Sequence, residues 1–94
     1  MKVGSFPKQP AEKLVVSVVY SDAIEPDNGI SSVESCEVFP AGELSASPVL
    51  LSTDRVRVWV DGGVDGTSYK ITVIVKTANG ERLEDELICK VKEI

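Results

Sequence analysis

The residue types that carry out acid–base and nucleophilic chemistry in enzymes are sparse in this sequence of 94 residues. Histidine, the commonest general base, is absent. No serine or cysteine lies in a recognisable nucleophile motif, so covalent catalysis has no candidate residue. The carboxylates Glu84 and Glu86 stand two residues apart, which on a strand gives a solvated acidic face. We therefore expect no catalytic residue and a protein that is not an enzyme.

Metal and cofactor chemistry has equally little support. The two cysteines, Cys36 and Cys89, are too far apart for a zinc motif, and no histidine is present to complete one. Asp61 and Asp65 have oxygens that suit calcium, as does the acidic loop at residues 22–27, but neither loop has the EF-hand pattern. Aspartates are also common in turns, where their side chains bond to nearby backbone amides, so these residues do not require a metal. We expect no metal and no cofactor.

The thiols of Cys36 and Cys89 admit two interpretations. A disulfide is possible if their strands meet across the core. Because the chain shows no secretion signal, two buried thiols that act as small apolar side chains are the simpler interpretation.

Composition places these residues in a single globular domain. Hydrophobic residues make up 43% of the chain and charged residues 27%, which is typical of a folded protein. The net charge of −5 argues against nucleic acid, because affinity for phosphates rests on lysine and arginine. Apolar runs are far shorter than the ~20 residues that span a bilayer, and no apolar signal core follows the N-terminus. We expect a soluble protein with no membrane partner and no export by a standard signal.

The stretch from residue 55 to residue 91 predicts three consecutive strands of one sheet. In residues 55–60 the side chains alternate, with three valines on one face and Arg55, Arg57 and Trp59 on the other. The loop that follows contains Gly62, Gly63 and Gly66. Because glycine permits positive φ, the chain is expected to turn back there. A β-branched strand at 67–76 comes next. The dipeptide Asn79-Gly80 then predicts a type I′ hairpin turn into a last strand at 82–94.

The residues before this stretch predict further strands around an all-β core. Residues 1–11 contain two prolines and are expected to form a flexible or extended arm. Residues 12–20 predict a strand with apolar groups on both faces, residues 30–39 favour a strand over a helix, and residues 48–51 suit a short edge strand. The sequence therefore predicts one antiparallel β-sandwich of about seven strands over residues 12–94.

Tyr69 and Trp59 are the large aromatics of the central stretch. Tyr69 follows a loop and begins a strand, which is the position of the tyrosine corner in immunoglobulin-type sandwiches. Its alternative is an exposed aromatic in a binding patch. Trp59 lies opposite the valine face together with Arg55 and Arg57, so it either covers a second apolar surface or contacts a partner.

A family resemblance rests on three segments of this stretch. They are Val56-Arg57-Val58-Trp59-Val60-Asp61-Gly62-Gly63, Gly66-Thr67-Ser68-Tyr69-Lys70-Ile71-Thr72-Val73 and Lys76-Thr77-Ala78-Asn79-Gly80-Glu81. Together they resemble small phage and prophage structural proteins of the head–tail and tail morphogenesis region. The Gly-Thr-x-Tyr portion also resembles fibronectin type III domains.

This resemblance implies an immunoglobulin-like fold and a place in the virion, with other virion proteins or a second copy as partners. It carries over no catalytic residue. Because unpaired sheet edges offer free backbone groups, assembly through those edges is expected, including a possible homo-oligomer. The alternative is a bacterial fibronectin type III-like module for adhesion or carbohydrate binding, which would be exported.

Overall fold

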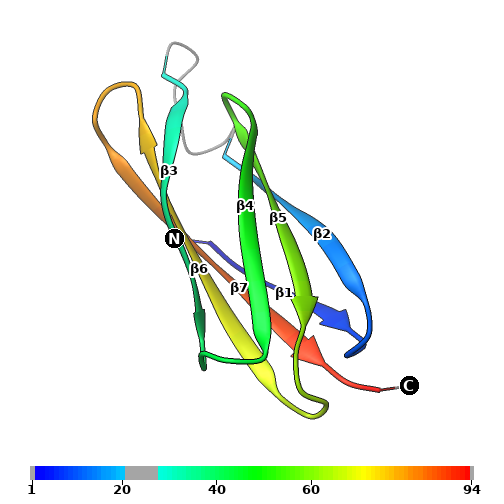
Figure 1. Ribbon diagram of the computed structural model, residues 1–94. Coiled ribbons are helices and arrows are strands. Elements are labelled where there is room, and N and C mark those ends of the chain that lie inside the picture. Colours follow the sequence, from blue (N-terminus) through cyan, green and yellow to red (C-terminus); the bar gives the residue numbers. More distant parts are fainter. Residues whose placement is uncertain (1, 21–27, 94) are drawn as a thin grey trace.

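The structure is a computed structural model that describes residues 2–20 and 28–93. Within these residues the regular elements are all strands: β1 (Lys2–Lys8), β2 (Lys13–Val19), β3 (Ile30–Phe39), β4 (Leu44–Ser52), β5 (Arg55–Gly62), β6 (Ser68–Thr77) and β7 (Arg82–Val91). They form a four-stranded sheet of order β1-β7-β6-β3 and a three-stranded sheet of order β2-β5-β4, packed face to face (Figure 1). The predicted all-β sandwich is confirmed.

The order of the strands corrects one prediction. β5 belongs to the three-stranded sheet, whereas β6 and β7 belong to the other, so residues 63–67 cross between the layers instead of closing a hairpin. Counted from β2, the two sheets match the B-E-D and C-F-G strands of immunoglobulin sandwiches. The immunoglobulin-like or fibronectin type III-like assignment itself stays a prediction.

The segment expected to be a flexible or extended arm contains a strand. β1 pairs with β7 in parallel, from Lys2 opposite Asp85 to Lys8 opposite Val91. Pro7 is compatible with this pairing because β1 lies at the edge of its sheet, where a strand needs hydrogen-bond donors on one side only. The structure therefore places residues 2–8 of the predicted arm in an extended edge strand.

The other edge and turn predictions differ in detail. β4 is longer than the predicted strand at 48–51, and it is an edge strand as expected.

The β6–β7 hairpin forms, but a type I′ turn needs positive φ at both Asn79 and Gly80. Only Gly80 has it, with φ of 90°, and its N–H donates to the Thr77 carbonyl at 3.0 Å. The loop is therefore a four-residue turn over residues 77–80 that ends on a glycine with positive φ, and it is not of type I′.

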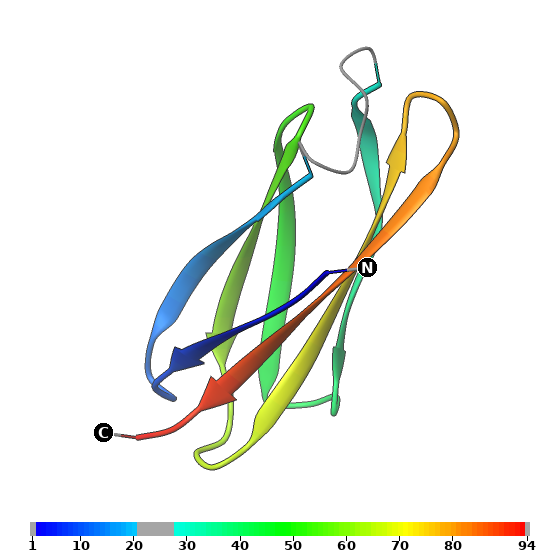
Figure 2. The same ribbon diagram turned by 180° about the vertical axis from the view of Figure 1, so that it is seen from behind.

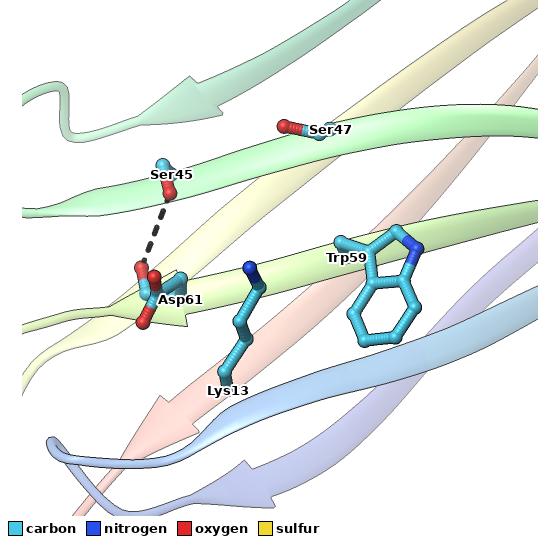
Figure 3. Close-up of a pocket in the computed structure, with 5 residues that line it drawn as sticks. All are labelled: Lys13, Ser45, Ser47, Trp59 and Asp61. Carbon is cyan, nitrogen blue, oxygen red and sulfur yellow. Dashed lines mark hydrogen bonds between the residues drawn. The ribbon is translucent and has the colours of Figure 1, made fainter.

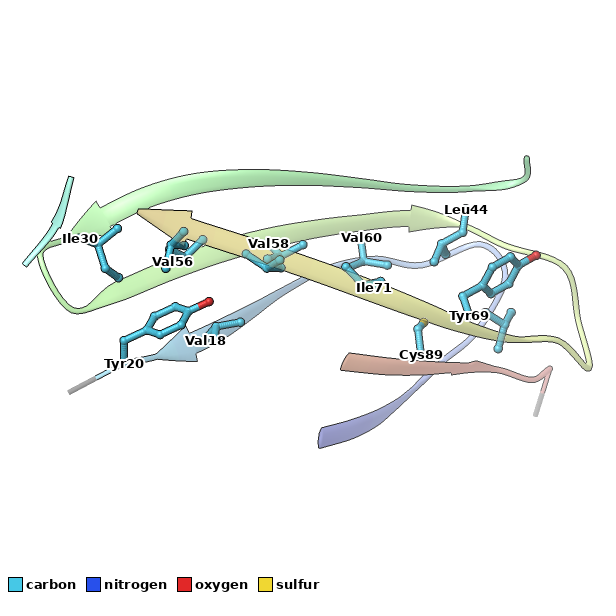
Figure 4. Close-up of a cluster of buried hydrophobic side chains, with 13 residues drawn as sticks. Val18, Tyr20, Ile30, Leu44, Val56, Val58, Val60, Tyr69, Ile71 and Cys89 are labelled. Carbon is cyan, nitrogen blue, oxygen red and sulfur yellow. The ribbon is translucent and has the colours of Figure 1, made fainter. Parts of the chain in front are cut away.

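The core lies between the layers and follows from strand alternation. Val56, Val58 and Val60 of β5 face the inward residues of β6, and all of these side chains are fully buried (Figure 4). The inward residues of β6 are Tyr69, Ile71, Val73 and Val75. Each buried aliphatic side chain stabilises the fold by roughly 1.5–3 kcal/mol. This core fixes the inner faces and leaves the outer faces and edges of the sheets free for contacts.

Candidate docking face

The outer face of the three-stranded sheet gathers the residues predicted to contact a partner. Strand pairing places Trp59 of β5 between Val15 of β2 and Ser47 of β4. Arg57 lies one row further along, between Ser17 and Val49. We name this surface the Trp59 face; its exposed side chains are Lys13, Val15, Ser17, Val19, Ser45, Ser47, Val49, Arg55, Arg57, Trp59 and Asp61.

Trp59 occupies the centre of this face because its neighbours in β5 point inward. Val58 and Val60 are 0% exposed, whereas Trp59 is 41% exposed. Two roles were considered for Trp59: covering a second apolar surface, or contacting a partner. A side chain that covers an apolar surface would be buried, so the exposure of Trp59 does not fit the first role. Val15 is also exposed beside it, and Val49 is exposed one row away beside Arg57, so the face presents several exposed apolar side chains.

A shallow hollow of about 280 Å³ lies next to the indole ring (Figure 3). Its lining residues are Lys13, Ser45, Ser47, Trp59 and Asp61. The Lys13 ammonium lies 5.8 Å from the centre of the Trp59 ring, a cation–π distance. An aromatic ring, a cation, a carboxylate and two hydroxyls on a rigid sheet suit recognition of a partner surface.

The charge of the Trp59 face contrasts with that of the chain. Lys13, Arg55 and Arg57 lie on it with a single carboxylate, Asp61, whereas the whole chain carries a net charge of −5. Arginine and tryptophan are also the residues most enriched at the energetic centres of protein interfaces. The face is therefore suited to an acidic partner.

The outer face of the four-stranded sheet is different in character. Lys70 of β6 and Glu86 of β7 form a salt bridge of 3.3 Å between partly exposed side chains. A hollow of about 420 Å³ lies at one end and is lined by Glu37, Val38, Phe39, Lys70 and Thr72. Phe39 is 72% exposed, and the sequence analysis did not single it out. The alternation of side chains at the end of β3 places Phe39 on the outward side, and this pattern could have identified it as exposed.

Four of the six residues predicted to be structural lie where β5 crosses to β6, whereas Asn79 and Gly80 lie in the β6–β7 hairpin. Tyr69 is buried, and its hydroxyl accepts a hydrogen bond of 3.0 Å from the Val64 N–H, a contact to upstream backbone of the kind expected of a tyrosine corner. Gly62 has φ of 82°, and a Cβ there would overlap the Glu43 carbonyl oxygen. At Gly63 a Cβ would lie 2.8 Å from Val91. Close packing as well as φ therefore requires glycine at both positions.

Lys8 was missed as a structural residue. Its side chain is 2% exposed, and its ammonium donates to the carbonyls of Gly62 at 2.6 Å, Gln9 at 2.8 Å and Pro10 at 3.4 Å. Buried cations need such partners, because their desolvation is otherwise very costly. The contact with Gly62 ties the four-stranded sheet to the end of β5.

Asn28 makes side-chain hydrogen bonds at the opposite end, within the four-stranded sheet. Its buried amide donates to the Glu81 carboxylate at 2.9 Å and accepts from the Asn79 N–H at 3.0 Å. These bonds attach the start of β3 to the β6–β7 hairpin. Sequence analysis placed Asn28 in a loop but could not assign its partners.

Cys36 and Cys89 lie on strands of the four-stranded sheet and not on the Trp59 face. Cys36 and Cys89 are both free, and burial raises the pKa of each thiol. Within the described part of the chain, no three potential ligands group together as a metal site would require. The acidic loop at residues 22–27 lies outside the described residues. No helix among residues 2–20 and 28–93 has the length and apolar character to cross a membrane.

The fold is thus a small all-β sandwich with an exposed aromatic and basic sheet face. The model of the family described as Podophage GP4 fiber-tail adaptor protein gp77 matches residues 8–90. The chain belongs to this family and is a structural component of the phage tail region, and so of the virion. The resemblance to phage tail-region proteins is confirmed.

Two further comparisons add little. The comparison with curated proteins gave no match. Among solved structures, the solution structure of Amebosin is similar with a TM-score of 0.44 and 8% identity, covering 98% of this chain and 99% of that chain. A similarity at that level carries no argument about this protein.

Proposed function

We propose that this chain is a non-enzymatic adaptor of the phage tail that docks on another virion protein through the Trp59 face. The observation that carries the proposal is the exposure of Trp59 on a rigid strand, with exposed Val15 beside it and exposed Val49 one row away. The family description, a fiber-tail adaptor, supports a role that joins two other tail components. The protein is made in the bacterial cytoplasm and incorporated as the tail assembles.

The chemistry of the face selects the partner surface. Lys13 lies over the Trp59 ring, with Arg57 one row and Arg55 two rows further along β5, so the partner offers acidic groups beside an apolar recess for the indole. Burial of an aromatic anchor of this kind often contributes more than about 2 kcal/mol to binding. The charges of Lys13, Arg55 and Arg57 contribute mainly to the rate of association with the partner and to the dependence of that rate on salt.

Complementation of a phage that lacks the gene tests this proposal. Trp59→Ala, supplied in trans, is expected to lower the amount of the protein in purified virions at least about tenfold, because a hot-spot truncation costs more than ~1.4 kcal/mol. Phe39→Ala is the matched control, since it removes an exposed aromatic from the other sheet. Thermal unfolding of each purified variant establishes that the fold is retained. Wild-type incorporation of Trp59→Ala would reject docking through this face.

A further inference from the structure

The two sheets leave four edge strands, and three of them carry features that oppose pairing with another chain. β1 contains Pro7 and β4 contains Pro48. β3 has two shifts of register and carries Glu34 and Glu37. Prolines, bulges and charges are the usual means by which proteins protect sheet edges.

β2 lacks all of these features. It runs from Lys13 to Val19 in unbroken register with β5, has no proline, and carries Lys13 as its one charged residue. Its side chains are apolar on both faces, with Val15 and Val19 exposed on the outside. Leu14 and Val16 are half-buried on the inside. Among the strands of residues 2–20 and 28–93, none pairs with β2 on the side away from β5.

The direction of the backbone groups in β2 follows from a single hydrogen bond. The Tyr20 N–H donates to the Asp54 carbonyl at 2.7 Å, which continues the β2–β5 ladder by one pair. In an antiparallel strand the N–H and C=O groups of alternate residues point to the same side. The even-numbered residues therefore bond to β5, whereas the groups of Val15 and Ser17 point to the free edge.

We propose that two copies of this chain pair along β2, antiparallel, about a two-fold axis at Val16. In this register Val15 lies opposite Ser17 of the second copy and Lys13 opposite Val19, so every residue of β2 has a partner. The residues whose backbone groups point outward face each other in both copies, as a hydrogen-bonded ladder requires. The two three-stranded sheets become one continuous sheet of six strands.

A second copy suits this edge better than an unrelated strand for two reasons. A strand that is apolar on both faces is best covered by another strand that is apolar on both faces, and β2 itself is such a strand. The antiparallel arrangement also separates the two Lys13 side chains by about 20 Å, at ~3.4 Å per residue. That distance exceeds the Debye length of ~8 Å at physiological salt, so the charges do not oppose pairing.

Sedimentation equilibrium of the purified full chain, from micromolar to millimolar concentration, tests the dimer. Ser17→Pro removes an N–H that points to the free edge and leaves the β2–β5 ladder intact. We expect a dimer for the wild type and at least a tenfold weaker one for Ser17→Pro, with the thermal midpoint of the monomer nearly unchanged. A wild type that stays monomeric throughout would overturn the proposal.

A second pair of variants covers the case in which the proline impairs folding. Ser17→Lys places two ammonium groups close together across the proposed axis and is expected to weaken the dimer. Ser47→Lys adds the same charge to the same sheet face at the far edge strand and is expected to leave the dimer intact. Equal dimerisation of Ser17→Lys and wild type, or equal weakening by both lysines, would reject the β2 interface. These measurements use the protein alone, so they are independent of tail docking.

Discussion

At one end of the sandwich, where β5 crosses to β6, the buried Lys8 ammonium and the close approach of Gly63 to Val91 bring the two layers together, whereas at the end with the β6–β7 hairpin the Asn28 amide attaches the start of β3 to its own sheet (Figure 2). The first end depends on close approach of backbone, and an added methyl group has no room there. The second depends on hydrogen bonds at the rim of the core, where water can replace a lost partner. The crossing end is therefore expected to be much more sensitive to substitution than the hairpin end.

Gly62→Ala is expected to have the largest effect. It requires positive φ of an L-residue, which costs about 1–2 kcal/mol, and it adds a clash with the Glu43 carbonyl. We expect a loss of at least about 3 kcal/mol in urea unfolding. Gly66→Ala is the control, because Gly66 has φ of 84° but its Cβ would meet no atom within 4 Å. Equal losses for the two variants would contradict the role of close packing.

Lys8→Met is expected to rank second. It keeps the volume of the side chain but leaves the buried carbonyl of Gly62 without its donor, at a cost of about 1–3 kcal/mol. Lys90→Met removes an exposed ammonium from the neighbouring strand and is expected to change the free energy of unfolding by less than about 0.5 kcal/mol. If both variants unfold at the same denaturant concentration, the ammonium does not hold the layers together.

Asn28→Ala tests the hairpin end and is expected to cost about 1–2 kcal/mol, through the loss of its bonds to Glu81 and to the Asn79 N–H. Asn79→Ala is a closely matched control, since Asn79 contributes its backbone N–H to this contact. A loss for Asn28→Ala as large as that for Gly62→Ala would show that the two ends are equally sensitive.

The two buried tyrosines sharpen the comparison, because they lie at opposite ends of the core (Figure 4). Tyr69→Phe removes the acceptor of the Val64 N–H and is expected to cost about 1 kcal/mol. The Tyr20 hydroxyl is buried without a hydrogen-bond partner in the described part of the chain, and burial together with the charge of Asp85 raises the pKa of Tyr20. Tyr20→Phe is therefore expected to be neutral or stabilising in thermal unfolding. A larger loss for Tyr20→Phe than for Tyr69→Phe would contradict this assignment.

The smallest expected effect depends on pH. Burial raises the pKa of Cys36, so the folded state retains the thiol proton more firmly than the unfolded state. The resulting stability is present below the unfolded thiol pKa of ~8.5 and is lost as pH rises above it. Urea unfolding at pH 7.5 and 9.5 should show a smaller decrease for Cys36→Ala than for the wild type. An identical decrease would mean that the thiol does not contribute.

Alternation along single strands made much of the inner face and the Trp59 face predictable. The period of two separates Val56, Val58 and Val60 from Trp59 without any knowledge of the partner strands. The glycine loop predicted a change of direction, but glycine conformations do not specify which sheet receives the next strand. The crossing of β5 to the second layer was missed for that reason.

The contacts that close the two ends could not be predicted, because they join residues far apart in sequence. Lys8 and Gly62 are separated by 54 positions, and Asn28 and Glu81 by 53. A lysine near two prolines has the composition of an exposed segment, and its burial depends on carbonyls contributed by another strand. The free edge of β2 likewise follows from the strand order and not from local pattern.

The parallel pairing of β1 with β7 also has a consequence for the order of folding. β1 leaves the ribosome before the other strands of the sandwich, and its partner residues 85–91 belong to β7, the last of these strands in chain order. Contacts of such large sequence separation form slowly, because the intervening chain must be ordered first. The remaining strands can therefore assemble as an open sandwich, with β1 added only after β7 has been made. Until then the edge of β7 is unprotected, and nascent chains are most exposed to mispairing during that interval.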